Sequence, residues 1–297
     1  MVKFGLTLGP VVWIAAALTL LPLLAAAFFS VRLAAWVECL PLPVRLLCPV
    51  LLCLPYVLVA TSAGTLQWNW LLLYALLPVT VAVLLWHASQ ADPAQRGNWR
   101  DFLVLAGLGL AVDLRWFEPA WPRHLAIFNK MLLLDAGIYG FLLVRRLDGV
   151  GFDLRLRLRD VTTGLREFAF YAPIALALGL GLGFLHLHLT RPHPAPLAGA
   201  FLYTFALIAV PEELFFRGWM QNLIERRLGR TPALLLTAAL FGLSHFNKRT
   251  ASFNWQYVLL AALAGIFYGR AWRRDRRVGA SAITHALVDT VWGQWLR

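Results

Sequence analysis

Carboxylate and imidazole side chains gather in three apolar stretches in the last third of the chain. The first stretch holds Glu212 and Glu213, the second ends at His245, and the third contains His285 and Asp289. An ionisable group inside a membrane helix costs about 2.5 to 3.5 kcal/mol on insertion scales, so such a group by default marks a functional site. These residues are therefore the candidate catalytic residues.

The two glutamates are predicted to have different roles. Glu213 and Arg217 are four residues apart, so on a helix they share one face and can form an ion pair with the acid on the N-terminal side. The predicted role of this pair is to support the site. Glu212 points about 100° away from Glu213, towards another wall of the site. Its carboxylate, turned away from the arginine and its compensating charge, is the predicted general base.

The histidine stretches repeat the spacing of four residues. Phe241 can pack beside His245 and hold the orientation of its imidazole, and His285 is paired in the same way with Asp289. If His245 meets Glu212, the two can hold one water, and the carboxylate removes its proton as the oxygen attacks a peptide carbonyl. His285 would then donate to the developing oxyanion, with Asp289 either fixing the tautomer of His285 or, when protonated, donating a hydrogen bond itself.

The composition indicates the elements that must position these groups. Hydrophobic residues make up 60% of the 297 residues, charged residues only 14%, and the mean hydropathy is +0.67. A soluble domain has about 25% charged residues, so a water-soluble globule is excluded. Apolar runs near 20 residues predict an all-α, polytopic transmembrane helical bundle of about 9–10 spans. We expect them at 10–31, 46–62, 68–86, 102–114, 125–144, 168–187, 197–216, 232–245, 255–271 and 278–296.

The net charge of +12 comes from arginines that fall mostly between the predicted spans. In a soluble protein this charge would suggest nucleic acid, but membrane proteins collect basic residues in cytoplasmic loops, where they meet anionic lipid headgroups. We therefore expect no nucleic-acid partner. Membrane lipids are the expected surroundings, and the expected location is the cell (inner) membrane, with several membrane crossings.

Three regions follow from this pattern. Residues 1–150 are predicted to form N-terminal transmembrane helices of unknown role, and residues 151–167 an interfacial basic segment. Residues 168–297 are predicted to form the catalytic helical core. In this core the helix that carries Glu212 either ends near Phe216 or continues to Leu228, with Gly229 as its cap.

The three motifs together resemble those of a known family. EExxxR at Glu212–Arg217, FxxxH at Phe241–His245 and HxxxD at His285–Asp289 are similar to the ordered motifs of the CAAX protease and bacteriocin-processing family, which includes the CAAX prenyl endopeptidases. Gly218-Trp219-Met220-Gln221 also fits the usual continuation of the first motif. The resemblance covers roughly residues 168–297.

The resemblance implies an intramembrane endopeptidase. Glu212 would activate the water, His245 would help to hold it, and His285 with Asp289 would form the oxyanion site. Glu213 and Arg217 would be the supporting pair. The implied partner is a peptide or protein substrate, with membrane-bound and lipidated substrates as candidates. The sequence departs from the family at Asp289, where the prenyl endopeptidases tend to have asparagine, and this weakens the transfer of their substrate.

Two alternatives remain open at this point. A zinc-dependent membrane protease would use His245, His285 and a glutamate as ligands, although the HExxH spacing of common zinc proteases is absent. We expect no cofactor, with zinc as the alternative. A non-catalytic membrane scaffold or an ion pathway could be built on the same charges, and it predicts that Glu212 is dispensable.

Overall fold

The computed structural model describes residues 9–188, 192–248, 250 and 252–296. These residues form helices joined by turns and loops, with no strand among them, so the predicted all-α fold is confirmed. Helices satisfy every backbone hydrogen bond within one segment, which a chain surrounded by lipid requires. The chain divides into two compact units: residues 1–94 with 98–147, and residues 95–97 with 148–297.

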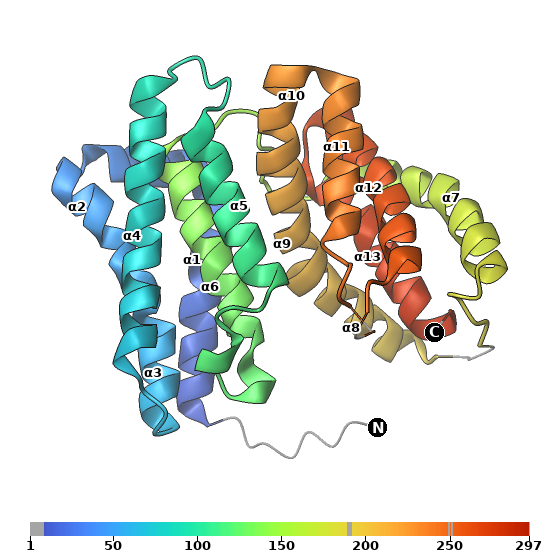
Figure 1. Cartoon of the computed structure of the whole chain (residues 1–297), viewed down its shortest axis with the longest axis horizontal. Coiled ribbons are helices and arrows are strands. Elements are labelled where there is room, and N and C mark those ends of the chain that lie inside the picture. Colours follow the sequence, from blue (N-terminus) through green and yellow to red (C-terminus); the bar gives the residue numbers. More distant parts are fainter. Residues whose placement is uncertain (1–8, 189–191, 249, 251, 297) are drawn as a thin grey trace. The chain divides into compact units, whose positions relative to one another are not determined.

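The first unit is built from long apolar helices (Figure 1). Its first helix begins with Pro10 and runs past the predicted end at Val31, with a break in helical geometry at Phe29. The α-helices are α1 (Pro10–Cys39), α2 (Leu42–Leu47), α3 (Leu54–Ser62), α4 (Trp68–Ala91), α5 (Trp99–Asp113) and α6 (Ile127–Ile138), with a π-helical turn at Tyr139–Val144 and 3-10 turns at Cys48–Cys53, Glu118–Ala120 and Arg123–Leu125.

A buried arginine ties together the helix ends of the first unit. The Asp101 carboxylate accepts a hydrogen bond from the backbone N–H of Asn98, while the Asn98 side chain accepts one from Arg100, which caps the start of α5. The guanidinium of Arg145 lies 3.0 Å from Asp101 and 2.8 Å from Asp92. Arg145 and Asp101 are buried, so each charge depends on the other.

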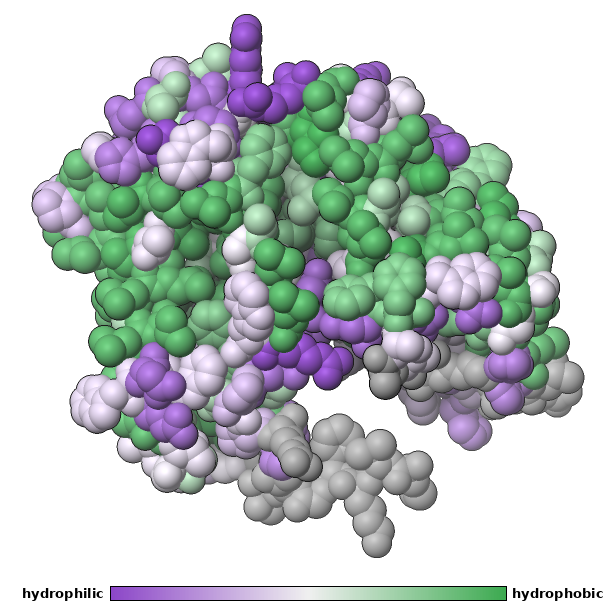
Figure 2. All heavy atoms as spheres, viewed as in Figure 1, coloured by the Kyte–Doolittle hydropathy of each residue, from purple (hydrophilic) through white to green (hydrophobic). Residues whose placement is uncertain are grey.

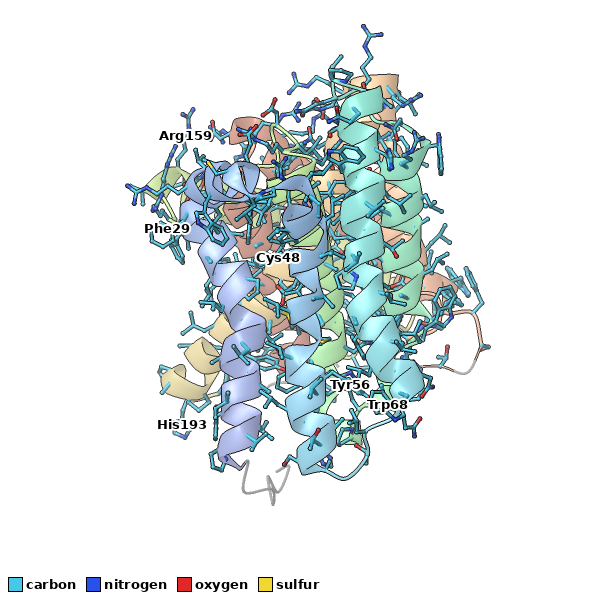
Figure 3. The ribbon with its side chains drawn as sticks, turned by 90° about the vertical axis from the view of Figure 1, so that its left-hand side faces the viewer. Phe29, Cys48, Tyr56, Trp68, Arg159 and His193 are labelled. Atoms are coloured by element: carbon cyan, nitrogen blue, oxygen red, sulfur yellow. The ribbon has the colours of Figure 1, made fainter. Side chains whose placement is uncertain are left out.

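An aromatic cluster fills the other end of the first unit. The rings of Tyr56 and Tyr74 stack with centroids 5.0 Å apart, and the indole N–H of Trp121 donates to the Tyr74 hydroxyl at 2.6 Å. The Tyr74 hydroxyl donates in turn to the Asn129 side chain. Figure 3 shows Tyr56 on α3, beside α4. The cluster thus gives the Trp121 indole N–H and the Tyr74 hydroxyl partners inside the protein.

The second unit contains the predicted core. Its α-helices are α7 (Leu158–Gly181), α8 (Pro194–Thr204), α9 (Val210–Glu213), α10 (Asn222–Leu228), α11 (Arg230–Leu243), α12 (Trp255–Asp275) and α13 (Val278–Trp295), with π-helical turns at Phe205–Ala209 and Leu214–Gln221. Before α7, residues 151–157 form neither helix nor strand, and residues 155–159 are exposed. The interfacial position of this segment stays a prediction.

The helix that carries Glu212 is longer than its first predicted limit. Helical residues run without interruption from Pro194 to Leu228, so the end at Phe216 is wrong and the continuation to Leu228 is correct. Gly229 caps this helix with φ +81°, a conformation that glycine adopts without strain. The π-helical turns flank α9 on both sides. Pro211 has no N–H to donate, and the wider turn before it accommodates this missing donor.

Close contacts hold the remaining helices of the second unit. A side chain at Gly242 would meet the Val258 carbonyl at 2.5 Å, so α11 and α12 approach closely only because glycine stands there. Gly265 and Gly269 on α12 are also in close contact with α11 and with the helix before it. At the start of α13, the guanidinium of Arg277 lies 2.8 Å from the buried Asp160. The last of these contacts joins the start of α13 to α7.

The surfaces of the helices suit a lipid environment. Five helical segments are long and apolar enough to cross a membrane: Pro10–Cys39, Leu42–Ser62, Trp68–Ala91, Ile127–Val144 and Pro194–Leu228. The other helices in the predicted spans are shorter or more polar. Large apolar side chains stay exposed, among them Val31 at 82% and Trp68 at 75%. Figure 2 shows hydrophobic side chains over the helices on this face, with hydrophilic residues gathered towards helix ends.

Replacing Arg145 tests the buried ion pair of the first unit. Arg145→Met leaves Asp101 buried without its counter-charge, and we expect a loss of about 3 to 5 kcal/mol of unfolding free energy. The measurement is chemical unfolding in detergent micelles. The matched control is Arg146→Met, whose pair with Glu38 is half exposed on both sides, and it should cost no more than about 1 kcal/mol. Equal losses in the two variants would contradict this account.

Candidate active site

The candidate residues come together in the second unit from three segments of its helices. Glu212 and Glu213 lie on α9, His245 lies in the turn that follows α11, and His285 and Asp289 lie on α13. Helix α13 packs against α9, α12 and α7. The fold therefore brings residues more than 70 positions apart in the sequence into one place.

The Glu213 carboxylate is the most heavily bonded group of the site. Its Oε2 accepts from the Arg217 Nε at 2.9 Å and from the Ser281 hydroxyl, and its Oε1 lies 2.9 Å from the Nδ1 of His285. Glu213 and Arg217 are fully buried. The predicted ion pair is present, whereas the spacing of the sequence gave no sign of the bonds from Ser281 and His285.

His285 is surrounded by carboxylates. Besides the contact of its Nδ1 with Glu213, its Nε2 lies 3.6 Å from the Asp289 Oδ2 and 3.9 Å from the Glu212 Oε2. Nδ1 therefore donates to Glu213, and Nε2 faces the other two acids. Glu213 thus holds the position that was expected for Asp289 as the group that fixes the tautomer.

The surroundings of Glu212 differ from the expectation in one respect. One group that can compensate the charge of Glu212 lies near it, because the Nε2 of His285 is 3.9 Å from the Glu212 Oε2. His285 reaches Glu212 from α13, and the spacing of residues along one helix does not predict such a contact between helices. The Glu212 side chain is 31% exposed, whereas Glu213 has no exposure, so Glu212 is the glutamate that water can reach.

The orientation of His245 is set by backbone groups. Its Nδ1 lies 2.9 Å from the Phe241 carbonyl oxygen and 3.2 Å from the Ser244 hydroxyl. Nδ1 therefore donates to the carbonyl, which leaves Nε2 as an acceptor. His245 interacts electrostatically with Glu212 and with His285.

The loop that follows His245 is joined to the start of α12. The Asn254 side chain donates to the Lys248 carbonyl and accepts from the backbone N–H of Tyr257, and the Asn254 backbone N–H donates to the Phe246 carbonyl. One residue thus caps α12 and holds the chain directly after His245. Tyr257, one turn into α12, lies against His245 with ring centroids 4.8 Å apart.

Aromatic rings hold both imidazoles in place. The Phe241 ring lies 4.9 Å from His245, as its spacing predicted, and it also meets the edge of His285 at 5.7 Å. Tyr268 stacks on His285, with centroids 4.7 Å apart and ring planes 13° apart. Sequence analysis missed Tyr257 and Tyr268, because an aromatic residue in an apolar helix has no distinguishing pattern.

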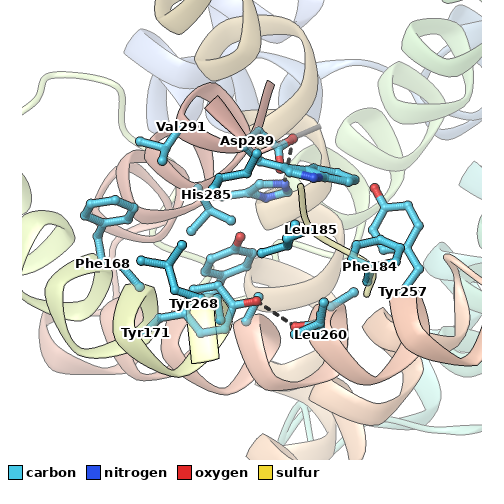
Figure 4. A pocket seen from close by; sticks show the side chains of 18 of the residues that line it. Phe168, Tyr171, Phe184, Leu185, Tyr257, Leu260, Tyr268, His285, Asp289 and Val291 are labelled. Atoms are coloured by element: carbon cyan, nitrogen blue, oxygen red, sulfur yellow. Dashed lines mark hydrogen bonds and ion pairs between the residues drawn. The ribbon is translucent and has the colours of Figure 1, made fainter. Parts of the chain in front are cut away.

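A cavity of about 100 Å³ opens beside the two histidines (Figure 4). Its walls are mainly apolar and aromatic, and His245, His285 and Asp289 line it. Glu212 is not among the lining residues, but it lies next to His285. The site combines an exposed carboxylate, two oriented imidazoles and a cavity with room for part of a ligand. These are the groups that general acid–base catalysis requires.

A metal site was the alternative interpretation of these residues. Across the described ranges, no group of three or more histidine, cysteine, aspartate or glutamate side chains has an arrangement suited to a metal ion. The contacts of His285 are instead those of an imidazole between carboxylates.

The comparisons with known proteins bear on this region of the chain. Residues 194–291 match the family model described as type II CAAX prenyl endopeptidase Rce1-like. The matched range contains the four candidate catalytic residues and the supporting pair. No curated protein and no solved structure matches the chain.

Replacing Arg217 tests the dependence of Glu213 on its counter-charge. We expect Arg217→Met to lower the free energy of unfolding by about 3 to 5 kcal/mol, because a buried carboxylate loses its cation. The double variant Glu213→Gln with Arg217→Met removes both charges and should recover part of this loss. Both are measured by chemical unfolding in detergent micelles. A double variant no more stable than the single one would show that charge compensation is not what the arginine provides.

Proposed function

The chain belongs, through residues 194–291, to the CAAX protease family, and on that premise we propose that Glu212 activates the water by which this protease hydrolyses a peptide bond. The family assignment and the apolar helices make it an integral membrane protein. The glutamate mechanism, the substrate and the cell (inner) membrane as its location are parts of the proposal.

One observation carries the proposal: the Nε2 of His285 faces Glu212 and Asp289 while its Nδ1 is held by the buried Glu213. The imidazole cannot turn without losing the Glu213 bond. In the protonated imidazole both ring nitrogens carry a hydrogen. Its Nε2–H is then oriented towards the side where Glu212 lies, and this is the arrangement that an oxyanion donor beside a general base requires.

The proposed reaction needs only groups of this chain and water. Glu212 accepts a proton from the water as its oxygen attacks the carbonyl carbon of the peptide bond, and the Nε2 of His245 helps to hold this water. His285 donates from Nε2 to the oxyanion that forms. When the C–N bond breaks, the proton held by Glu212 passes to the leaving amine. No covalent enzyme intermediate forms.

The supporting groups act through the histidines. Glu213 and Arg217 hold His285 from its Nδ1 side, and Phe241 contacts both imidazoles. Asp289 lies close to Nε2, where a carboxylate favours a protonated, positively charged imidazole. It takes the place at which asparagine is usual in prenyl endopeptidases, and in this proposal it is a positioning residue for His285.

The proposed substrate is a peptide or protein. Membrane-bound and lipidated substrates are the candidates that the family implies. A non-catalytic scaffold or ion pathway remains the competing function, and it predicts no dependence of proteolysis on Glu212.

Removing the proposed base tests the mechanism. We expect Glu212→Gln and His245→Ala each to reduce the rate of peptide cleavage at least about 10²-fold, because general acid–base catalysis contributes about 10² to 10⁴-fold. Purified protein in micelles is incubated with a peptide library, half of which carries a farnesyl group on cysteine, and products are identified by mass spectrometry. The control is Glu38→Gln. Glu38 forms a half-exposed ion pair with Arg146 outside the site, so this variant should retain wild-type rates.

The results separate the competing functions. Unchanged cleavage by both site variants would remove the base assignment. No cleavage of any peptide by the wild-type protein would favour the scaffold. Cleavage restricted to the farnesylated half would assign a lipidated substrate.

Metal removal tests the zinc alternative. The protein is treated with 1,10-phenanthroline and EDTA, and elemental analysis checks that no metal remains. We expect the peptidase activity to survive this treatment, since the proposed reaction uses a carboxylate in place of a Lewis acid. The chelators are removed before assay, so that they do not act on the peptides. Activity that disappears with the metal and returns on addition of zinc would establish the metalloprotease instead.

A further inference from the structure

The cavity beside His245 and His285 has more room than the attacking water needs. Its volume is about 100 Å³, and an apolar cavity of about 150 Å³ accommodates a benzene molecule. This space is therefore of the order of one large amino-acid side chain. Because both histidines line it, a group that fills it lies next to the peptide bond that they are proposed to address.

The walls of the cavity favour an apolar occupant. Rings of Tyr171, Tyr257 and Trp292 contribute to them, together with aliphatic side chains from α7, α12 and α13. The Tyr171 hydroxyl already donates to the Leu260 carbonyl at 2.8 Å, so it is engaged (Figure 4). In the described part of the chain, no lysine or arginine is among the lining residues, so the walls provide no strong cation for an acidic group.

Asp289 gives the cavity a negative end. It lines the cavity with its side chain 30% exposed, and it interacts electrostatically with Tyr171 and Tyr268. Glu212 and Glu213 bring two more carboxylates to the same imidazole. Arg217 compensates one of these three charges, and a protonated His285 compensates a second. One negative charge remains on this side of the site.

A cation also lies near His245. Lys248, on the loop after α11, interacts electrostatically with His245. It is not among the residues that line the cavity, whereas Asp289 is. A substrate group inside the cavity therefore meets Asp289 more directly than it meets Lys248.

Resting on the proposed peptidase function, we propose that this cavity is a subsite for one large apolar side chain of the peptide substrate and that Asp289 excludes acidic side chains from it. A carboxylate placed there would lose its water and face a like charge in surroundings of low dielectric constant, and both effects oppose binding. A basic side chain gains attraction but also loses its hydration, so its advantage over a neutral side chain is smaller. We expect the cavity to accept neutral and basic side chains much better than acidic ones.

The test varies the charge of one substrate side chain. From a peptide that the wild-type protein cleaves, three versions are made at each residue flanking the cleaved bond, with norleucine, lysine or glutamate. For one flanking residue, we expect kcat/KM for the norleucine peptide to exceed that for the glutamate peptide at least about tenfold. In Asp289→Asn this ratio should fall to less than about threefold, because the amide carries no charge.

Lys248→Met is the matched control. It changes the charge of the site by one unit in the opposite direction, and it should leave the ratio of the two peptides unchanged. If Asp289→Asn cleaves neither peptide, the affinities of the same peptides for that variant give the ratio. A change of the ratio in Lys248→Met that is equal in size and opposite in direction to that in Asp289→Asn would assign the selectivity to net charge and not to the cavity, which overturns the proposal.

The remaining outcomes separate this proposal from the proposed function. Cleavage of glutamate and norleucine peptides at equal rates by the wild-type protein overturns the subsite and leaves the peptidase in place. Cleavage that requires a farnesyl group and is independent of the flanking charge also overturns the subsite and leaves the peptidase in place. Absence of any cleavage removes both.

Discussion

The buried carboxylate of Glu213 is the constraint on which the site depends. An ionised acid without contact to water is stable only when donors surround it, and here they come from Arg217 on its own helix and from Ser281 and His285 on α13. Because these donors have fixed directions, satisfying the acid also sets the position of α13 and the rotation of the imidazole. The orientation of Nε2 is thus a consequence of charge compensation on the opposite side of the ring.

Sequence analysis predicted the contacts that one helix determines. Glu213 with Arg217, Phe241 with His245 and His285 with Asp289 are each four residues apart, and all three pairs are in contact. The helical fold class was equally accessible, because long apolar runs permit few structures in a membrane. Local periodicity carries this information, so no knowledge of how helices pack was needed.

The contacts between helices were not accessible in this way. The bonds of His285 and Ser281 to Glu213 join positions about 70 residues apart, and they depend on how α13 lies against α9. The place of Glu212 near His285 likewise depends on how α13 lies against α9. Helix limits were imprecise for a related reason, since apolar character fades gradually towards the membrane surface, as in α1 beyond Val31.

The amide of Asn254 has a consequence for the way the protein responds to change. His245 lies in a turn beyond the last residue of α11, so the helix itself does not fix its position. The hydrogen bonds of Asn254 connect the segment after this turn to the start of α12. A shift of α12 would therefore move the His245 imidazole, so substitutions on the outer face of that helix would reach the proposed site through this one peptide segment.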